Sequence, residues 1–205
     1  MIKHAIKKVT SDKFRKNIRE IEKILKWFIN GRPEPLPAFA KRRFLKKIAR
    51  KSKINIFIET GTFNGATVKS MKPFFKKIIS IEVFPEFVNS AKEKFKRDDN
   101  IEIIEGDSGI LLSKILFDIN EPVFFWLDGH YSGEGTGKGA LETPIIKEIE
   151  SILNHKIKNH LILIDDARCF NGTSDYPKLE DFFNFVKRLN PSVSYEVKKD
   201  MIIIK

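Results

Sequence analysis

Cysteine is almost absent from this 205-residue chain, in which Cys169 is the only one. A single thiol cannot form an internal disulfide or, by itself, a zinc site, which is consistent with a reducing compartment. The chain also lacks an apolar run of about eighteen residues or more, and no apolar stretch follows Lys3, Lys7 and Lys8 as in a signal peptide. We therefore expect a soluble, cytoplasmic protein without a transmembrane segment.

Two phosphate-binding motifs are missing as well. The dinucleotide motif G-x-G-x-x-G is absent, because Phe63 occupies the place of its second glycine. The glycine-rich segment from Gly133 to Gly139 lacks the Gly-Lys-Ser/Thr ending of a phosphate loop, although it could fold over a substrate. No internal repeat is visible. A pyrophosphate-binding loop of either kind is therefore not expected.

Acidic residues are scarce in the first quarter of the chain. Residues 1–53 contain 18 Lys and Arg against 4 Asp and Glu, a net charge of +14, whereas residues 54–205 contain 20 against 23, a net charge of −3. A positively charged segment of this kind attracts nucleic acid, an anionic membrane or acidic glycans. A Lys-rich solvated helix face explains the charge equally well. We expect a basic helical extension over 1–53 and one α/β domain over 54–205.

Two helices joined by a proline-rich linker are expected in the extension. The first begins near Ser11-Asp12 and ends near Asn30-Gly31, before Pro33, Pro35 and Pro37. The catalytic domain or a second copy of the chain must cover its apolar stripe, so we expect a homodimer contact or a lid. The stripe consists of Phe14, Ile18, Ile21, Leu25 and Phe28.

The second helix is marked by Phe44, Leu45 and Ile48 and is the most basic part of the chain. Its other faces carry Lys41, Arg42, Arg43, Lys46, Lys47, Arg50 and Lys51.

From Ile54 onward, short apolar strands alternate with helical patterns, which predicts an α/β domain with a mainly parallel sheet. The expected strands are 54–59, 78–82, a third that ends in Gly106-Asp107, 123–127 and 161–164, followed by a closing hairpin of 193–197 and 201–204.

A tight turn follows the first strand. Glu59 closes the strand, Gly61 and Gly65 bracket the turn, and a helix begins at Ala66. Glycine at both positions allows positive φ and a close approach of the backbone to a ligand. We therefore expect a small molecule to bind here.

Acidic residues end the next two strands. Glu82 follows the glycine turn by about twenty residues, where nucleoside-binding sheets place the acid that accepts hydrogen bonds from ribose hydroxyls. Asp107 ends the third strand. Helix caps and solvated strand ends are the alternative explanation of these acids.

The acidic residue followed by G-x-x-x-G, from Glu59 to Gly65, resembles the first motif of class I S-adenosylmethionine-dependent methyltransferases. The resemblance implies a Rossmann-like, doubly wound sheet of seven strands in the order 3-2-1-4-5-7-6, with S-adenosylmethionine as cofactor. It also implies that the segment ending in Gly106-Asp107 meets the adenine ring, where Asp107 would accept from the exocyclic amine. The cofactor-binding residues that it implies are Glu59, Thr60, Gly61, Thr62, Phe63, Gly65, Thr67, Glu82, Val83, Gly106, Asp107, Ser108 and Asp128.

Three further segments, at 126–133, 142–145 and 163–168, resemble methyltransferase-like proteins of polysaccharide and other glycan biosynthesis, including the macrocin O-methyltransferase-like group. This resemblance covers residues 54–205. It implies an acceptor that is a sugar or glycan, and small metal-dependent O-methyltransferases are similar in placing acids at the ends of the fourth and fifth strands.

Asp128, Asp165 and Asp166 supply hard oxygen donors that suit Mg²⁺, which would lower the pKa of a bound hydroxyl. Alternatively, Asp128 binds cofactor or loop amides and Asp166 caps a turn. His130 lies in a glycine-flanked loop, where we expect a general base, although a lone histidine is more often structural. The expected catalytic residues are Asp128, His130 and Asp165. Tyr131, Glu142 and Arg168 are candidate substrate contacts, and surface ion pairing explains Glu142 and Arg168 equally well.

Together these patterns predict an S-adenosylmethionine-dependent O-methyltransferase that acts on a sugar hydroxyl of a glycan or glycolipid intermediate. One alternative is an RNA methyltransferase whose basic extension binds the phosphate backbone. Against it, the fourth strand ends in Asp-Gly-His, without the Asn/Asp-Pro-Pro-Tyr/Phe pattern of base N-methyltransferases. A second alternative is a cofactor-binding scaffold without activity.

Overall fold

The computed structural model describes residues 21–22, 24–129 and 143–205, and the chain divides into two compact units between Lys41 and Arg42. In the first unit, residues 21–22 and 24–29 are helical. Helix α2 (Ala38–Ser52) begins in the first unit and continues into the second, so most of this basic helix is grouped with the α/β unit. Among the described residues, no helix has the length and apolar character needed to cross a lipid bilayer.

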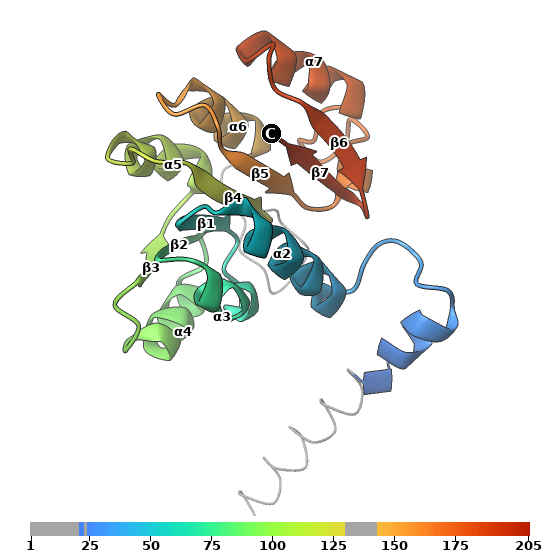
Figure 1. The fold of residues 1–205 in the computed structure, drawn as a ribbon, viewed down its shortest axis with the longest axis vertical. Helices are drawn as coiled ribbons and strands as arrows, with labels where there is room; N and C mark the ends of the chain where they lie inside the picture. The colour runs from blue at the N-terminus through green and yellow to red at the C-terminus, as the bar shows by residue number, and fades with distance from the viewer. Residues whose placement is uncertain (1–20, 23, 130–142) are drawn as a thin grey trace, which may run out of the picture. The chain divides into compact units, whose positions relative to one another are not determined.

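The second unit is built on a seven-stranded sheet in the order β3-β2-β1-β4-β5-β7-β6 (Figure 1). Strands β1 to β5 pair in parallel, and β7 is antiparallel to both β5 and β6. This order confirms the fold that the sequence predicts. The strands are β1 (Ile56–Thr60), β2 (Lys77–Glu82), β3 (Ile101–Glu105), β4 (Val123–Leu127), β5 (Leu161–Ile164), β6 (Tyr195–Lys198) and β7 (Met201–Ile204).

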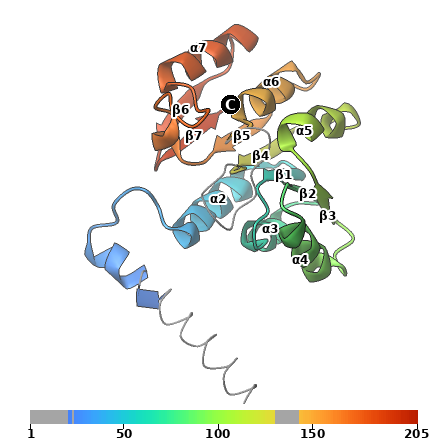
Figure 2. The ribbon, with the colours of Figure 1, turned by 180° about the vertical axis from the view of Figure 1, so that it is seen from behind.

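Helices cover both faces of the sheet (Figures 1 and 2). Helices α5 (Ser108–Phe117), α6 (Ile145–Asn154) and α7 (Leu179–Leu189) pack their apolar residues against one face, where they share a core with the strands. The remaining helices are α3 (Ala66–Met71) and α4 (Pro85–Phe95). Helix α2 lies on the α3 side, because the Arg50 guanidinium is 5.3 Å from the ring of Phe74, in the turn after α3.

The central strands are apolar on both faces because both faces are covered. Every residue of β1 and β4 is buried. On the α2–α4 side, the rings of Phe57, Phe75 and Phe124 meet with centroids 5.1 to 5.7 Å apart. This packing fixes β1 and β4 next to each other, so their carboxyl ends lie at the same edge of the sheet.

Pro144 is the N-cap residue of helix α6, and the backbone N–H of Ile145 donates to Thr143 Oγ1 at 3.4 Å. The closing hairpin begins at Tyr195 in place of Val193.

Candidate functional site

The glycine turn joins β1 to α3 at the carboxyl edge of the sheet. Gly61 has a φ of 85°, and a Cβ atom there would lie 2.5 Å from the backbone oxygen of Asp128, at the end of β4. Gly65, with a φ of 65°, is the N-cap residue of α3. Lys94 of α4 donates from Nζ to the backbone oxygen of Asn64 at 2.7 Å. Only glycine fits at position 61, because the ends of β1 and β4 meet there.

Glu59 lies buried beneath this turn. Ser80 Oγ of β2 donates to Glu59 Oε2 at 2.7 Å, and Thr62 Oγ1 lies 2.6 Å from Ser80 Oγ. Burial raises the pKa of Glu59 to about 8, although hydrogen bonds from Ser80 and Thr67 act in the opposite direction. At neutral pH, therefore, the protonated form of this carboxyl prevails.

Glu82 ends β2 and reaches the glycine turn. Its Oε2 accepts from the backbone N–H of Phe63 at 2.8 Å, and its Oε1 accepts from the N–H of Phe84 at 3.0 Å. Phe63 has a φ of 46°, a backbone conformation that is uncommon outside glycine. The carboxylate is thus fixed beside the turn, and each of its oxygens retains a second lone pair for a ligand.

Asp107 stands at the start of α5, next to the end of β3. Its Oδ1 accepts from the backbone N–H of Gly109 at 2.8 Å, which makes Asp107 the N-cap of this helix. Ser108 Oγ donates to Glu148 Oε1 at 2.6 Å. The backbone N–H of Gly106 donates to the oxygen of Glu82 at 2.8 Å, so the ends of β2 and β3 are joined. Helix capping, one of the two explanations left open above, does occur at Asp107, and its Oδ2 remains a possible acceptor.

These groups fit a nucleoside cofactor. Ribose hydroxyls and an exocyclic amine are donors, and the edge offers the acceptors Glu82 and Asp107 at the ends of adjacent strands. Thr60 is fully buried at the end of β1, and its Oγ1 has no hydrogen-bond partner among the residues that the structure describes. The cofactor residues expected from the sequence between 59 and 128 therefore all lie at or next to the carboxyl ends of β1 to β4.

The ends of β4 and β5 are adjacent too. The backbone N–H of Asp128 donates to the oxygen of Thr60 at 3.1 Å, and that of Asp165 donates to the oxygen of Leu127 at 3.0 Å. Asp165 is buried, and its Oδ1 accepts from the N–H of Asp166 at 2.9 Å. Asp128 and Asp165 thus lie at the same edge of the sheet as the glycine turn.

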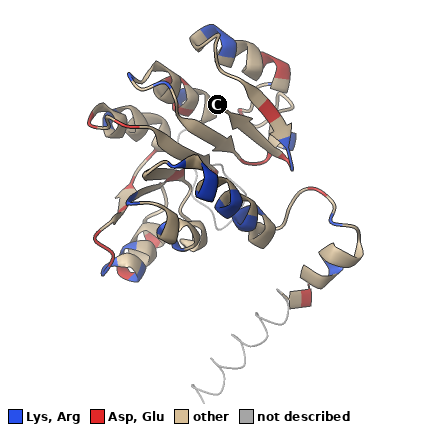
Figure 3. Ribbon diagram, viewed as in Figure 1, with Lys and Arg blue, Asp and Glu red and all other residues tan. Residues whose placement is uncertain are grey.

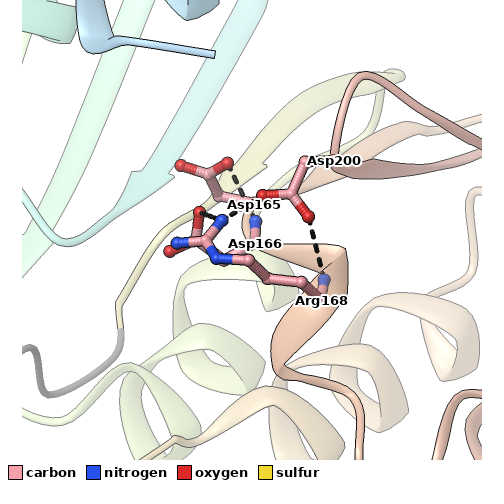
Figure 4. Close-up of polar contacts among 4 residues, drawn as sticks. All are labelled: Asp165, Asp166, Arg168 and Asp200. Carbon is pink, nitrogen blue, oxygen red and sulfur yellow. Dashed lines mark hydrogen bonds and ion pairs between the residues drawn. The ribbon is translucent and has the colours of Figure 1, made fainter. Parts of the chain in front are cut away.

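Asp166 takes part in an ion-pair cluster with Arg168 and with Asp200 of the last hairpin (Figure 4). Arg168 Nη1 donates to Asp166 Oδ1 at 2.8 Å and also pairs with Asp200, between β6 and β7. The backbone N–H of Arg168 donates to Asp200 Oδ1 at 2.9 Å. The two carboxylates raise the pKa of the Arg168 guanidinium, in spite of its partial burial. Arg168 was explained above either as a substrate contact or by ion pairing. The structure shows the ion pairs.

The described residues do not form the expected three-aspartate magnesium site. No group of three His, Cys, Asp or Glu residues that could hold a metal ion occurs within 21–22, 24–129 and 143–205. Asp166 has a φ of 55°, which turns its carboxylate onto Arg168. Consecutive strand residues point to opposite faces unless the chain turns. The chain does turn at Asp166, but this turn brings the carboxylate to Arg168. A metal at this edge would therefore have fewer than three such ligands from the described part of the chain.

His130, Tyr131 and Glu142 lie outside the described residues. The expectations of a general base and of two substrate contacts at these positions stay predictions.

Two residues near this edge were not found from the sequence. Tyr176 is buried against Phe170, with ring centroids 5.1 Å apart, and is hydrogen-bonded to the Thr143 side chain. Burial, as the main cause, raises the pKa of the Tyr176 hydroxyl. Asp200 is the second of these residues. The strand order could have indicated it, because β7 runs antiparallel to β5, so the residue that precedes β7 must lie near the carboxyl end of β5.

No protein-family model matches the chain, and a comparison with curated sequences finds a distant relative. The ribosomal RNA small subunit methyltransferase A of Caldanaerobacter subterraneus subsp. tengcongensis is 23% identical over 175 residues. The match covers 79% of this chain, which spans about 60% of the length of that protein.

Several solved structures are similar in fold. An O-methyltransferase from Bacillus cereus, in complex with S-adenosylhomocysteine (SAH), gives a TM-score of 0.61 at 17% identity and covers 89% of this chain and 88% of its own. The SAH-bound methyltransferase PaMTH1 of Podospora anserina gives 0.57 at 16% identity, with coverage of 84% and 80%. The O-methyltransferase TomG of Streptomyces achromogenes gives 0.56 at 14% identity, with coverage of 87% and 84%. With the strand order described above, these likenesses show that the chain has the fold of the class I S-adenosylmethionine-dependent methyltransferases.

Proposed function

We propose that this protein is an S-adenosylmethionine-dependent O-methyltransferase that acts on a sugar hydroxyl of a glycan or glycolipid intermediate. One observation supports S-adenosylmethionine as the cofactor. The Glu82 carboxylate is held against the glycine turn by the backbone N–H groups of Phe63 and Phe84, at the edge where open α/β sheets bind ligands. The O-methyltransferases among the proteins of similar fold support the choice of oxygen as the acceptor atom.

When bound, S-adenosylmethionine supplies an activated methyl group. Glu82 would accept hydrogen bonds from its ribose hydroxyls, and Asp107 would accept from the exocyclic amine of its adenine. Val83 and Ser108 follow the ends of β2 and β3 and would line the nucleoside. The glycine turn from Gly61 to Gly65 would let the backbone approach the rest of the molecule closely.

The acceptor hydroxyl must lose its proton as it attacks, because a neutral sugar hydroxyl is a poor nucleophile. Asp128 and Asp165, at the ends of β4 and β5, would orient this hydroxyl, and His130 would take the proton at its imidazole. The resemblance of residues 126–133 and 163–168 to glycan-modifying proteins supports a sugar as the acceptor.

Binding of SAH tests the cofactor assignment. We expect Glu82→Ala to weaken SAH binding by about tenfold to hundredfold, because hydrogen bonds to a carboxylate are lost. Titration calorimetry measures the affinity, and thermal unfolding checks that the variant is folded. Glu86→Ala removes an exposed carboxylate four residues further along the chain, in the first turn of α4, and should leave binding unchanged. A folded Glu82→Ala variant with full affinity would refute the ribose assignment.

A chelator tests whether the protein needs a metal ion. Because the described residues assemble no three-ligand group, we expect SAH binding to be unchanged in EDTA. Methyl transfer to a panel of sugar and lipid-linked acceptors should then be compared with and without EDTA. Full activity in EDTA would eliminate the magnesium site. Loss that is restored by added Mg²⁺ would show that methyl transfer needs the metal ion.

An RNA methyltransferase is the second candidate, and two observations favour it. The curated relative is a ribosomal RNA methyltransferase, and residues 1–53 carry a net charge of +14. Radiolabelled methyl transfer to ribosomal RNA, followed by nucleoside analysis, distinguishes the two functions. Label in RNA, with none in any sugar acceptor, would replace the proposal above by this one.

A further inference from the structure

A row of large apolar side chains is exposed on the helix that precedes α2. Ile21, Leu25, Phe28 and Ile29 expose 55%, 54%, 46% and 81% of their surface. The first three are spaced by four and three residues, so they share one face of the helix. Contiguous apolar side chains in water are unfavourable, and such a row typically marks a binding surface.

Aromatic contacts within the first unit fix the end of this helix. Trp27 donates from Nε1 to the backbone oxygen of Pro33 at 2.8 Å, and its ring centroid lies 5.5 Å from that of Phe39 in the first turn of α2. The Arg32 guanidinium lies 4.9 Å from the ring centroid of Phe28. The apolar row therefore ends beside a cation and beside the start of α2.

Helix α2 presents cations on the side opposite its buried residues. Leu45 and Ala49 are buried, whereas Arg43, Lys47 and Arg50 are exposed, at spacings of four and three. The helix contains no acidic residue, and the described part of the chain forms no ion pair with these three side chains. Figure 3 shows the resulting run of basic residues along α2.

We propose that residues 21–53 dock on the surface of an anionic lipid bilayer. A lipid interface binds both the apolar row and the cations of α2, since apolar side chains enter the acyl boundary and cations pair with headgroups. A second copy of the chain would cover the apolar row but would bring together two segments that each carry +14. RNA phosphates would match the cations and leave Ile21 and Leu25 in water. The inference does not depend on the proposed acceptor, although a lipid-linked glycan would be found at the same surface.

Sedimentation of the full chain with vesicles tests this surface. We expect binding to vesicles of phosphatidylcholine with phosphatidylglycerol, weakening with salt, and at least tenfold weaker binding to phosphatidylcholine alone. Each surface cation contributes about fivefold, so Arg43→Gln with Lys47→Gln should weaken binding by about 25-fold. Leu25→Gln with Phe28→Gln should weaken it tenfold or more.

Matched controls come from exposed residues of the α/β unit. Phe117→Gln removes an apolar side chain that is 79% exposed on α5, and Lys92→Gln removes an exposed cation on α4. Both should bind vesicles as the unmodified chain does. SAH affinity is measured for every variant and should not change, which separates this proposal from the proposed enzymatic function.

Three outcomes would overturn the inference. The first is no binding of the unmodified chain to anionic vesicles. The second is a dimer in light scattering that Leu25→Gln with Phe28→Gln dissociates while vesicle binding persists, which would make the row a contact between copies. The third is RNA binding that Arg43→Gln with Lys47→Gln abolishes while vesicle binding is unchanged.

Discussion

Glu59 shows how a single residue acquires its properties from burial. The side chain lies beneath the glycine turn with hydroxyl groups as its hydrogen-bond partners, and its pKa is raised to about 8. In the unfolded chain the pKa is near 4.5. Between these values the folded state binds the proton and the unfolded state does not, so the free energy of unfolding falls as pH rises through this range.

The isosteric variant Glu59→Gln removes this titration. We expect the unmodified protein to lose stability relative to Glu59→Gln as pH rises from 6.5 to 8, with a limiting slope of about 1.4 kcal/mol per pH unit. Urea unfolding at several pH values measures the difference, and Glu86→Gln serves as an exposed control. Parallel pH curves for the unmodified protein and Glu59→Gln would mean that Glu59 is ionised in the folded state.

The range above pH 6.5 is chosen because of His155 and His160, whose rings are joined at 2.9 Å between Nδ1 and Nε2. Burial lowers the pKa of His160 from 6.5 to about 4 and also lowers that of His155. Their contribution to stability is complete only about one pH unit above 6.5 and is lost as pH falls towards 4. It therefore has the opposite sign to that of Glu59, and it cancels in the difference between the unmodified protein and Glu59→Gln because both contain the two histidines.

At the scale of elements, the site depends on how closely the ends of β1 and β4 approach. In Gly61→Ala, the new Cβ would meet the backbone oxygen of Asp128, which cannot move without shifting β4. We expect this variant to lose about 2 kcal/mol or more of unfolding free energy beyond the cost of positive φ, and to bind SAH more weakly.

Gly172→Ala is the matched control for this variant. Gly172 has a φ of 87°, close to the 85° of Gly61, but a Cβ there would meet the flexible side chain of Lys178 at 3.1 Å. It should show the cost of positive φ alone and leave SAH binding unchanged. Equal losses of stability in the two variants would contradict the role given to the contact between β1 and β4.

At the scale of the whole molecule, the proposed functions are separated along the chain. All proposed cofactor residues lie between Glu59 and Asp128, whereas the apolar row lies between Ile21 and Ile29. A chain that begins at Pro33 keeps α2 and Leu36 and lacks the row. We expect it to bind SAH within about twofold of the full chain and to bind anionic vesicles more weakly. A folded chain of this length that lost SAH binding would show that the first residues contribute to the cofactor site.

The sequence by itself determined where the strands lie and which acids end them. Strands β4 and β5 have the predicted bounds, because a fully buried strand is a short apolar run with polar residues at both ends. The glycine turn and Glu82 were likewise found from local patterns. The strand order was predicted through the resemblance to methyltransferases, which the fold confirms.

Only the tertiary structure decided which side chains meet. Ser80 contacts Glu59 because β1 and β2 pair in that register, and Asp166 turns to Arg168 and Asp200 because the chain enters a left-handed conformation after β5. Strand position follows from the apolar character of neighbouring residues in the chain. Side-chain partners follow from the register between strands far apart in the sequence, and from turns whose conformation depends on what they pack against. For this reason the sequence predicted a site of three aspartates at one edge of the sheet, whereas in the folded chain the carboxylate of Asp166 pairs with Arg168.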